Sequence, residues 1–285
     1  MERKVTVPDI LKRKGGDPIV ALTAYDFPFG RIADIAGIDF ILVGDSLGMV
    51  VQGMDTTLPV TLDEMVYHCR MVARARQRAL LVCDLPFGSY QVSPVDAVRN
   101  ASRLVKEGGA EAVKLEGGVA MAETIRAIAS VDIPVMGHIG LTPQSVHRMG
   151  GHKVQGQRHG AKAGQRERII DDALAVEDAG AFALVLEGMP LDLAAEITDR
   201  LTIPTIGIGA GAHCDGQILV LHDVLGLSDR TSPKFAKRYA ELWQAAGAAI
   251  ADYAREVRNH TFPNDSHSFH SLTSVPREEK AAAEG

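Results

Sequence analysis

Short apolar runs alternate with amphipathic segments along most of the chain. Each run has the length of a buried strand, and the segment after it repeats its apolar positions at helical spacing. We predict strands at seven places: Ile19–Ala24, Phe40–Val43, Ala79–Cys83, Ala112–Leu115, Ile133–Met136, Phe182–Leu186 and Ile203–Ile208. An eighth strand is weaker in the pattern, and its best candidate is Leu219–Leu221. The alternation predicts a parallel sheet with helices packed outside it.

Hydroxyl residues, prolines and glycines mark the ends of the predicted helices. Thr61 and Glu64 form a capping box that opens a helix running to about Arg78. Ser93–Pro94 opens the next helix, and Gly108–Gly109 ends it. The remaining helices are predicted at Val7–Lys14, Asp26–Ala36, Val119–Ala129, Arg168–Ala179, Leu191–Leu201 and Lys234–Arg258.

Strands and helices in this order favour an eightfold (β/α)8 TIM barrel with an N-terminal helix, and a doubly wound sheet is the competing architecture. No linker long enough to separate two domains is present, so we predict one domain over residues 1–270. Residues 271–285 are rich in Ser, Glu, Lys and Ala, which predicts a disordered tail.

Composition excludes several classes of function. A net charge of -6 over 285 residues gives no electrostatic reason to expect nucleic acid as the main ligand. Cys69, Cys83 and Cys214 form no CxxC pair, which suits a reducing compartment and excludes a disulfide framework. Because no apolar run approaches membrane-spanning length and no signal peptide is visible, we expect a cytoplasmic protein without membrane contact.

Carboxylates stand where three of the predicted strands end. Asp45, Asp84 and Glu116 each follow an apolar strand closely. A single carboxylate at such a position could equally cap a helix or a loop. Parallel strands bring their carboxyl ends to one rim, however, and oxygen ligands gathered there are what Mg²⁺ prefers. The set therefore favours a metal site.

Other polar residues share this rim. Lys114 and Glu116 alternate around Leu115, so both point to the same side of their strand, either as a buried ion pair or with the lysine aimed at an anionic substrate. We favour the second interpretation, because neither side chain is buried without cost. His138 is either a polar core residue or a hydrogen-bond donor to a developing oxyanion. Glu187 follows five apolar residues, a setting that favours a general base.

Several other features point to function less clearly. The segment Gly207–Ala212 resembles a dinucleotide-binding turn, but its glycines more simply let the backbone pass close to a ligand or make a tight turn. The loop Ile139–Gly164 and the start of the next helix are basic, which suits a lid or a contact for an anionic cosubstrate. Its basic residues are Arg148, Lys153, Arg158, Lys162, Arg166 and Arg168. Packing is the simpler interpretation for four further residues, His68, Met71, Phe87 and Tyr90.

A set of ordered motifs is similar to one known family, over roughly residues 5 to 270. The motifs are Thr23–Asp26, Val43–Gly48, Gln52–Gly53, Thr57–Thr61, Asp84–Phe87, Val113–Gly118, Gly137–Ser145, Gly150–Gly156, Leu184–Glu187, Ile206–Gly211 and Asp215–Val220. Together they resemble those of the ketopantoate hydroxymethyltransferases. The stretch Gln157–Arg168 is longer than is usual in that family, and the tail after His270 is additional.

The resemblance implies a barrel of the phosphoenolpyruvate/pyruvate-binding type, Mg²⁺ dependence, 5,10-methylenetetrahydrofolate as cosubstrate and a homodecamer. Carried over position by position, Asp45 and Asp84 would bind Mg²⁺, with Glu116 at the metal or just behind it. Asp45, Ser46, Asp84 and Lys114 would contact the 2-oxo acid. Glu187 would accept the proton.

The implied reaction forms ketopantoate for pantothenate biosynthesis. Glu187 would deprotonate 3-methyl-2-oxobutanoate (alpha-ketoisovalerate) at C3, and the enolate, stabilised by Mg²⁺, would take a hydroxymethyl group from the folate. A Mg²⁺-dependent lyase or mutase of the same superfold is the nearest rival, and it would need no folate. A barrel that only binds a ligand is the non-enzyme alternative, and it would catalyse no proton exchange.

Overall fold

The computed structural model describes residues 3–157, 165–229 and 232–271. The chain divides into two compact units, one up to residue 240 and one from residue 241. The single domain predicted over residues 1–270 stays a prediction, and the tail predicted from residue 271 lies, apart from its first residue, outside the described residues.

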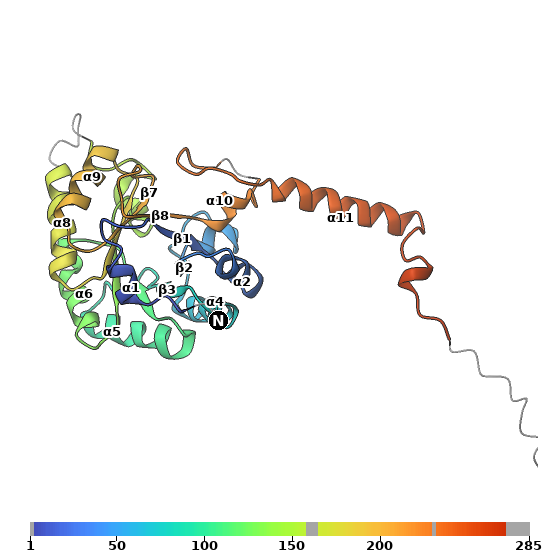
Figure 1. The fold of residues 1–285 in the computed structure, drawn as a ribbon, viewed down its shortest axis with the longest axis horizontal. Helices are drawn as coiled ribbons and strands as arrows, with labels where there is room; N and C mark the ends of the chain where they lie inside the picture. The colour runs from blue at the N-terminus through green and yellow to red at the C-terminus, as the bar shows by residue number, and fades with distance from the viewer. Residues whose placement is uncertain (1–2, 158–164, 230–231, 272–285) are drawn as a thin grey trace, which may run out of the picture. The chain divides into compact units, whose positions relative to one another are not determined.

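A closed barrel of eight parallel strands forms the first unit (Figure 1). β1 pairs with β2 on one side and with β8 on the other, so the sheet has no free edge and the doubly wound alternative is excluded. The strands are β1 Ile19–Thr23, β2 Phe40–Val43, β3 Leu80–Asp84, β4 Ala112–Lys114, β5 Val135–Gly140, β6 Ala183–Glu187, β7 Thr205–Ile208 and β8 Gly216–Leu219. The predicted TIM barrel is confirmed.

The eighth strand was predicted three residues too late. β8 begins at Gly216, where it pairs with Ile19, and Leu221 already opens helix α10. Only Gly216 and Ile218 in this strand are buried, while Gln217 is exposed. A strand with one buried apolar side chain has no apolar run, so its sequence does not show the pattern that marked the other seven.

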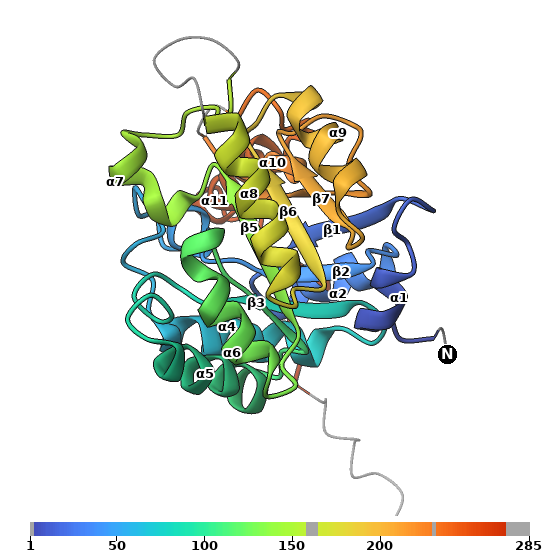
Figure 2. The same cartoon turned by 90° about the vertical axis from the view of Figure 1, so that its left-hand side faces the viewer.

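Helices cover the outside of the barrel, as Figure 2 shows for α4, α5, α6 and α8. The helices of the first unit are α1 Val7–Leu11, α2 Phe27–Ile35, α3 Leu47–Val50, α4 Leu62–Ala75, α5 Pro94–Arg103, α6 Ala122–Ala129, α7 Val146–Met149, α8 Gln165–Asp178, α9 Leu191–Arg200 and α10 Leu221–Leu225. A π-helical turn, Leu104–Gly108, extends α5. The predicted capping box opens α4: the Glu64 amide donates to Thr61 Oγ1 at 3.3 Å, and the Thr61 amide donates to Glu64 Oε2 at 2.7 Å.

Two layers of core result from the alternation of side chains along each strand. On β2, Ile41 and Val43 pack against the outer helices, whereas Phe40 and Leu42 belong to the cluster inside the barrel. Ile10 of α1 is fully buried in that inner cluster, so the N-terminal helix closes the floor of the barrel. The opposite end, where the strands finish, is the end that carries polar side chains.

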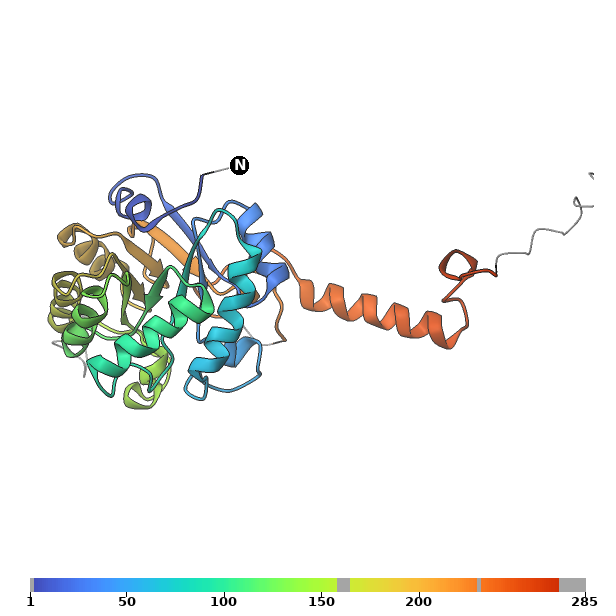
Figure 3. The ribbon, with the colours of Figure 1, turned by 90° about the horizontal axis from the view of Figure 1, so that it is seen from below.

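The last helix, α11, covers Leu242–Arg258 and belongs to the second unit (Figure 3). It was predicted to begin at Lys234. Instead, Ala236 closes a turn with Pro233, and the Tyr239 amide donates to the Val224 carbonyl at 2.8 Å, so tertiary contacts hold this stretch out of the helix. Within the described residues, no helix is long and apolar enough to cross a membrane.

Candidate active site

Five neighbouring strands deliver a cluster of polar side chains to one end of the barrel. Each of these residues lies at or just past the carboxyl end of its strand, except His138, which lies inside β5. Five of them are less than 7% exposed. The cluster consists of Asp45 after β2, Asp84 on β3, Lys114 on β4, Glu116 just after β4, His138 on β5 and Glu187 on β6. The structure thus brings together all the residues predicted as metal ligands, substrate contacts and base, with Ser46 beside Asp45.

A buried lysine stands among the carboxylates. Lys114 Nζ lies 3.0 Å from Asp84 Oδ1, and the Asp45 amide donates to Asp84 Oδ2 at 3.0 Å. Burial acts to lower the pKa of Lys114, but Asp84, Glu116 and Asp45 outweigh burial and raise it. Lys114 therefore keeps its positive charge at neutral pH. Its strand alternates as the sequence predicted, because Glu116 also faces this cluster while Leu115 packs in the outer core.

Negative charge exceeds positive charge in this cluster. Burial, and then the nearby Asp84 carboxylate, raise the pKa of Asp45 to about 7. Burial and then Asp45 raise the pKa of Glu116 well above its usual value. One ammonium is thus too little charge for three buried carboxylates, Asp45, Asp84 and Glu116. The donor set fits a hard divalent cation, which would supply the missing positive charge.

Another buried carboxylate, that of Asp34, has a structural role in this fold, because hydrogen-bond donors satisfy its negative charge. Asp34 on α2 accepts the backbone N–H groups of Gln77, Arg78 and Ala79 at 2.7–2.9 Å. Burial acts to raise the pKa of Asp34, but these N–H groups outweigh burial and lower it. The pKa of Asp45 shifts in the opposite direction, which makes the cluster at the strand ends a candidate functional site.

The number of protein ligands also fits Mg²⁺. Within the described part of the chain, no group of three or more His, Cys, Asp or Glu side chains is placed so that it could hold a metal ion. Zinc in structural sites takes four protein ligands, whereas Mg²⁺ is commonly held by one or two carboxylates, with waters and substrate oxygens completing its shell. Asp45 and Asp84 could provide those two carboxylates.

His138 lies between Lys114 and Glu187. Its Nδ1 is 3.2 Å from Lys114 Nζ, and its Nε2 is 3.1 Å from Glu187 Oε2. Burial and then Lys114 lower the pKa of His138, so the imidazole is neutral. An ammonium group can only donate, so Nδ1 accepts and Nε2 carries the proton. Nε2 makes no aligned hydrogen bond among the described residues, which leaves this N–H able to donate to a ligand.

Gln144 ties two of the carboxylates together, and sequence reasoning did not single it out. Its side-chain amide donates to Asp45 Oδ2 at 2.9 Å, and its backbone amide donates to Glu116 Oε2 at 3.0 Å. The Tyr90 hydroxyl donates to Gln144 Oε1 at 2.7 Å. Tyr90, predicted only to pack, is therefore also part of the polar network. The one available signal was the position of Gln144 in the motif Gly137–Ser145.

Ser46 and Gly44 complete the rim at β2. Ser46 Oγ lies 2.8 Å from the Tyr25 hydroxyl, which is buried. A Cβ at position 44 would lie 2.9 Å from Ser46 Oγ and 3.4 Å from Asp84 Oδ2. A side chain at position 44 would force Ser46 Oγ to shift, whereas its Cβ would be in ordinary contact with Asp84 Oδ2.

The glycines after β7 serve packing. Gly209 has a φ of +61°, and a Cβ there would lie 2.8 Å from the ring of Phe235. At Gly211, with a φ of +84°, a Cβ would lie 2.6 Å from Leu191 Cβ. The positive φ angles agree with the predicted tight turn, and the contacts show that the backbone also passes close to Phe235 and Leu191.

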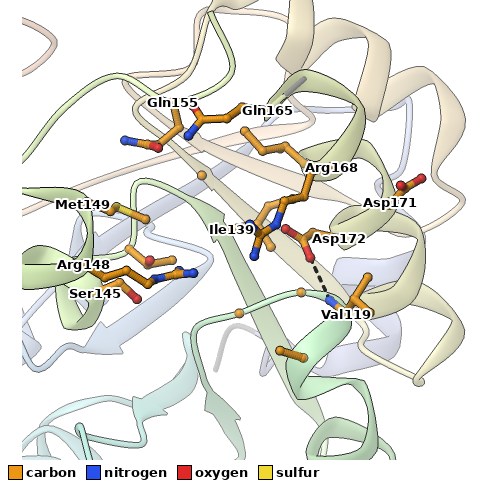
Figure 4. Close-up of a pocket in the computed structure, with 16 residues that line it drawn as sticks. Val119, Ile139, Ser145, Arg148, Met149, Gln155, Gln165, Arg168, Asp171 and Asp172 are labelled. Atoms are coloured by element: carbon orange, nitrogen blue, oxygen red, sulfur yellow. Dashed lines mark hydrogen bonds between the residues drawn. The ribbon is translucent and has the colours of Figure 1, made fainter. Parts of the chain in front are cut away.

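A cavity of about 770 Å³ is lined by the turn after β4, by the end of β5 and by residues of α7 and α8, and by none of the six cluster residues (Figure 4). Arg148 and Arg168 are the members of the basic set that line it. Arg166 is paired instead with Asp192 and Glu196, at 3.0 and 2.6 Å. Two others, Arg158 and Lys162, lie outside the described residues.

Comparison with known proteins identifies the family. The family model described as ketopantoate hydroxymethyltransferase matches residues 4–265. The chain belongs to the ketopantoate hydroxymethyltransferase family. The 3-methyl-2-oxobutanoate hydroxymethyltransferase of Pelobacter propionicus is 60% identical over 270 residues, which cover 94% of this chain and 98% of that one. The relative of the same name from Geobacter metallireducens is also 60% identical, with coverage of 94% and 100%. Membership of the ketopantoate hydroxymethyltransferase family makes this chain an enzyme of the transferase class.

Solved structures with the same fold are more distant. Phosphonopyruvate hydrolase superposes with a TM-score of 0.60 at 14% identity, covering 95% of this chain and 92% of that one. A 2,3-dimethylmalate lyase, described as a member of the PEP mutase/isocitrate lyase superfamily, gives a TM-score of 0.57 at 17% identity, covering 92% and 91%. These likenesses show that the chain shares the barrel fold of these enzymes.

Proposed function

We propose that this enzyme transfers a hydroxymethyl group from 5,10-methylenetetrahydrofolate to 3-methyl-2-oxobutanoate and so forms ketopantoate, a precursor in pantothenate biosynthesis. The observation that carries the proposal is the buried cluster in which Lys114 lies among three carboxylates. The His138 imidazole lies between Lys114 and Glu187. This arrangement suits the binding and deprotonation of a small 2-oxo acid. Membership of the family supports the same substrate.

Asp45 and Asp84 would hold Mg²⁺, with Glu116 at the metal or behind it. Burial and then the Asp84 carboxylate raise the pKa of Asp45 to about 7. The assignment is supported because a bound cation would offset both effects. When bound, the ion would supply Lewis-acid chemistry, because it draws electron density from the oxygens of a 2-oxo acid and makes the neighbouring C–H more acidic.

The protein side chains divide the remaining tasks. Lys114 provides a fixed positive charge for the anionic substrate, with Ser46 at the same rim. Glu187 is the proton acceptor for C3, and its side chain is the most exposed of the acidic residues in the cluster, so it can reach a bound ligand. The His138 Nε2–H lies 3.1 Å from Glu187 Oε2 and can donate to the oxygen that gains charge as the proton leaves.

Deprotonation prepares C3 to bond to the one-carbon unit of the folate. One molecule of water supplies the oxygen of the new hydroxymethyl group. The products are ketopantoate and tetrahydrofolate, so the atoms balance without an oxidant or a reductant. The buried site suits this order of events, since it keeps bulk water away from the carbanion.

Product analysis tests the proposal directly. Purified protein, 3-methyl-2-oxobutanoate, Mg²⁺ and 5,10-methylenetetrahydrofolate are expected to give ketopantoate by mass spectrometry, and omission of the folate is expected to stop its formation. Cleavage of a pyruvate-like substrate without folate would instead favour a lyase or mutase. The absence of both reactions with folded protein would favour a protein that only binds its ligand.

Gln144→Leu is expected to lower kcat/KM for the 2-oxo acid by about 10- to 100-fold, because hydrogen bonds to charged groups contribute about 1.5–3 kcal/mol. The leucine would remove the side-chain donor to Asp45 Oδ2 and leave the backbone donor to Glu116 Oε2 in place. Steady-state kinetics measures the effect, with Gln77→Leu at an exposed position as the matched control. Equal kinetics for both variants would mean that Gln144 does not position the carboxylates.

The oligomeric state remains a prediction. We infer a homodecamer from the family resemblance. The 17-residue α11 has no buried residue within this chain, and its exposed apolar side chains include Trp243, Ile250 and Tyr253. Such a surface supports association between subunits. Light scattering coupled to size-exclusion chromatography is expected to give about ten times the mass of 30.5 kDa, and a monomer would contradict the inference.

A further inference from the structure

Tyr25, which follows β1, contacts one of the proposed substrate-binding residues from within the protein. Its hydroxyl lies 2.8 Å from Ser46 Oγ. Tyr25 is only 2% exposed, whereas Ser46 is half-buried. A ligand at this rim can therefore reach Ser46, while almost all of Tyr25 is covered by protein.

The Ser46 hydroxyl is not used to cap a helix. Ser46 occupies the N-cap position of α3, where a serine side chain usually accepts a backbone amide, yet within the described chain it makes no such bond. Ser93, at the N-cap of α5, behaves as expected, because its Oγ accepts the Asp96 amide at 3.1 Å. The Ser46 hydroxyl contacts Tyr25 instead of the backbone, and its hydrogen is available to a ligand.

The two hydroxyls lie close to the buried carboxylates. Gly44 borders both Ser46 Oγ and Asp84 Oδ2, since a Cβ there would lie within 3.4 Å of each. Burial, and to a smaller extent the charges of Asp84 and Asp45, raise the pKa of Tyr25 above its ordinary value. Tyr25 is therefore a neutral phenol at physiological pH, and it has a hydrogen to donate.

The direction of the hydrogen bond between the two hydroxyls follows from the chemistry of a 2-oxo acid. A serine hydroxyl carries one hydrogen, and carboxylate and ketone oxygens can only accept one. When Ser46 donates to such an oxygen, it can only accept from Tyr25. The tyrosine then fixes the rotation of the Ser46 hydroxyl and points its hydrogen away from the protein interior.

Two contacts hold Tyr25 itself in place. His68 Nδ1 lies 2.6 Å from the carbonyl oxygen of Tyr25, which can only accept, so Nδ1 is the donor. The ring of His222, on α10, lies 5.6 Å from the tyrosine ring, measured between centroids. Because both its backbone and its ring are held, Tyr25 offers Ser46 a donor of fixed position.

We propose that Tyr25 is a positioning residue, whose hydroxyl donates to Ser46 Oγ and so directs the Ser46 hydrogen toward an oxygen of the bound 2-oxo acid. This inference rests on the proposed function. Tyr25 does not touch the substrate and acts only through Ser46. Its loss weakens binding of the 2-oxo acid and leaves proton removal by Glu187 unaffected.

A double-mutant cycle at Tyr25 and Ser46 tests the inference, with Mg²⁺-dependent exchange of the C3 proton of 3-methyl-2-oxobutanoate as the activity. Tyr25→Phe is expected to raise the KM about 3- to 10-fold, the value of a neutral hydrogen bond, with kcat unchanged. Ser46→Ala is expected to raise the KM about 10- to 100-fold, the value of a hydrogen bond to a charged group. The double variant is expected to match Ser46→Ala, because no serine hydroxyl is left to position. Tyr67→Phe, at an exposed position on α4, is the matched control and is expected to match the wild type.

Three results would overturn the inference. An equal rise in KM from Tyr25→Phe with and without Ser46 would mean that Tyr25 supports the structure and does not act through the serine. An unchanged KM in Tyr25→Phe, or a lower kcat at unchanged KM, would also show that it is wrong while the proposed function stands. If the wild type exchanges no C3 proton, the proposed function fails, and the role of Tyr25 fails with it.

Discussion

Glu187→Gln is expected to lower turnover by about 10²- to 10⁴-fold, the range that a general base contributes. Glutamine has the size of glutamate and keeps its place beside His138, but its amide cannot accept a proton from carbon. Binding of 3-methyl-2-oxobutanoate and Mg²⁺ is expected to survive, because Lys114, Asp45 and Asp84 are unchanged. Steady-state kinetics and isothermal titration calorimetry measure the two effects separately.

Glu123→Gln provides the control for this variant. Glu123 is exposed on α6, away from the cluster. Its substitution also replaces a carboxylate with an amide. Its kinetics are expected to match those of the wild type. Wild-type turnover in Glu187→Gln would remove Glu187 from the mechanism, and the loss of substrate binding together with turnover would make Glu187 a binding residue instead of a base.

Lys114→Met is expected to impair both stability and activity. Within the described cluster, Lys114 carries the only ammonium group near Asp84, and its Nζ lies 3.0 Å from Asp84 Oδ1. Removal of one partner from a buried ion pair costs about 3–5 kcal/mol of folding free energy, because the remaining charge is left uncompensated. We expect a loss of that size in urea denaturation without Mg²⁺, and a loss of turnover of at least about 100-fold because the anionic substrate loses its counter-charge.

Two further variants show which property of Lys114 matters. Lys106→Met removes an exposed lysine after α5 and is expected to change neither stability nor turnover. Lys114→Arg keeps the charge and is expected to recover most of the stability but little of the turnover, since a planar guanidinium does not place its nitrogens where Nζ lies. If Lys114→Met were as stable and as active as the wild type, the ion pair would have no role in either.

The barrel and its reactive end were predictable from local patterns. Seven strands are recognisable in the sequence as apolar runs. Because parallel strands end at one rim of a barrel, Asp45, Asp84 and Glu187 could be predicted to lie near one another without knowledge of tertiary contacts. Strand alternation alone places Lys114 and Glu116 on the same side. These predictions succeeded because each depends on residues that are adjacent in the sequence.

Features that depend on distant contacts were not predictable. Gln144 meets Asp45 across 99 positions of sequence, and nothing near Gln144 indicates that contact. The sequence around Tyr90 predicts only a core aromatic residue, but its hydroxyl donates a hydrogen bond to Gln144 Oε1. The start of α11 was missed for the same reason, because a tertiary hydrogen bond from Tyr239 to Val224 overrides local helical preference.

Proton NMR of 3-methyl-2-oxobutanoate in D₂O tests the central claim, that the buried cluster is a site for removing the C3 proton. The wild-type protein is supplied with Mg²⁺, with or without EDTA, and no folate is added. We predict that the C3 proton signal disappears in the presence of Mg²⁺ and persists with EDTA. A signal that persists with folded, Mg²⁺-loaded protein would contradict the account.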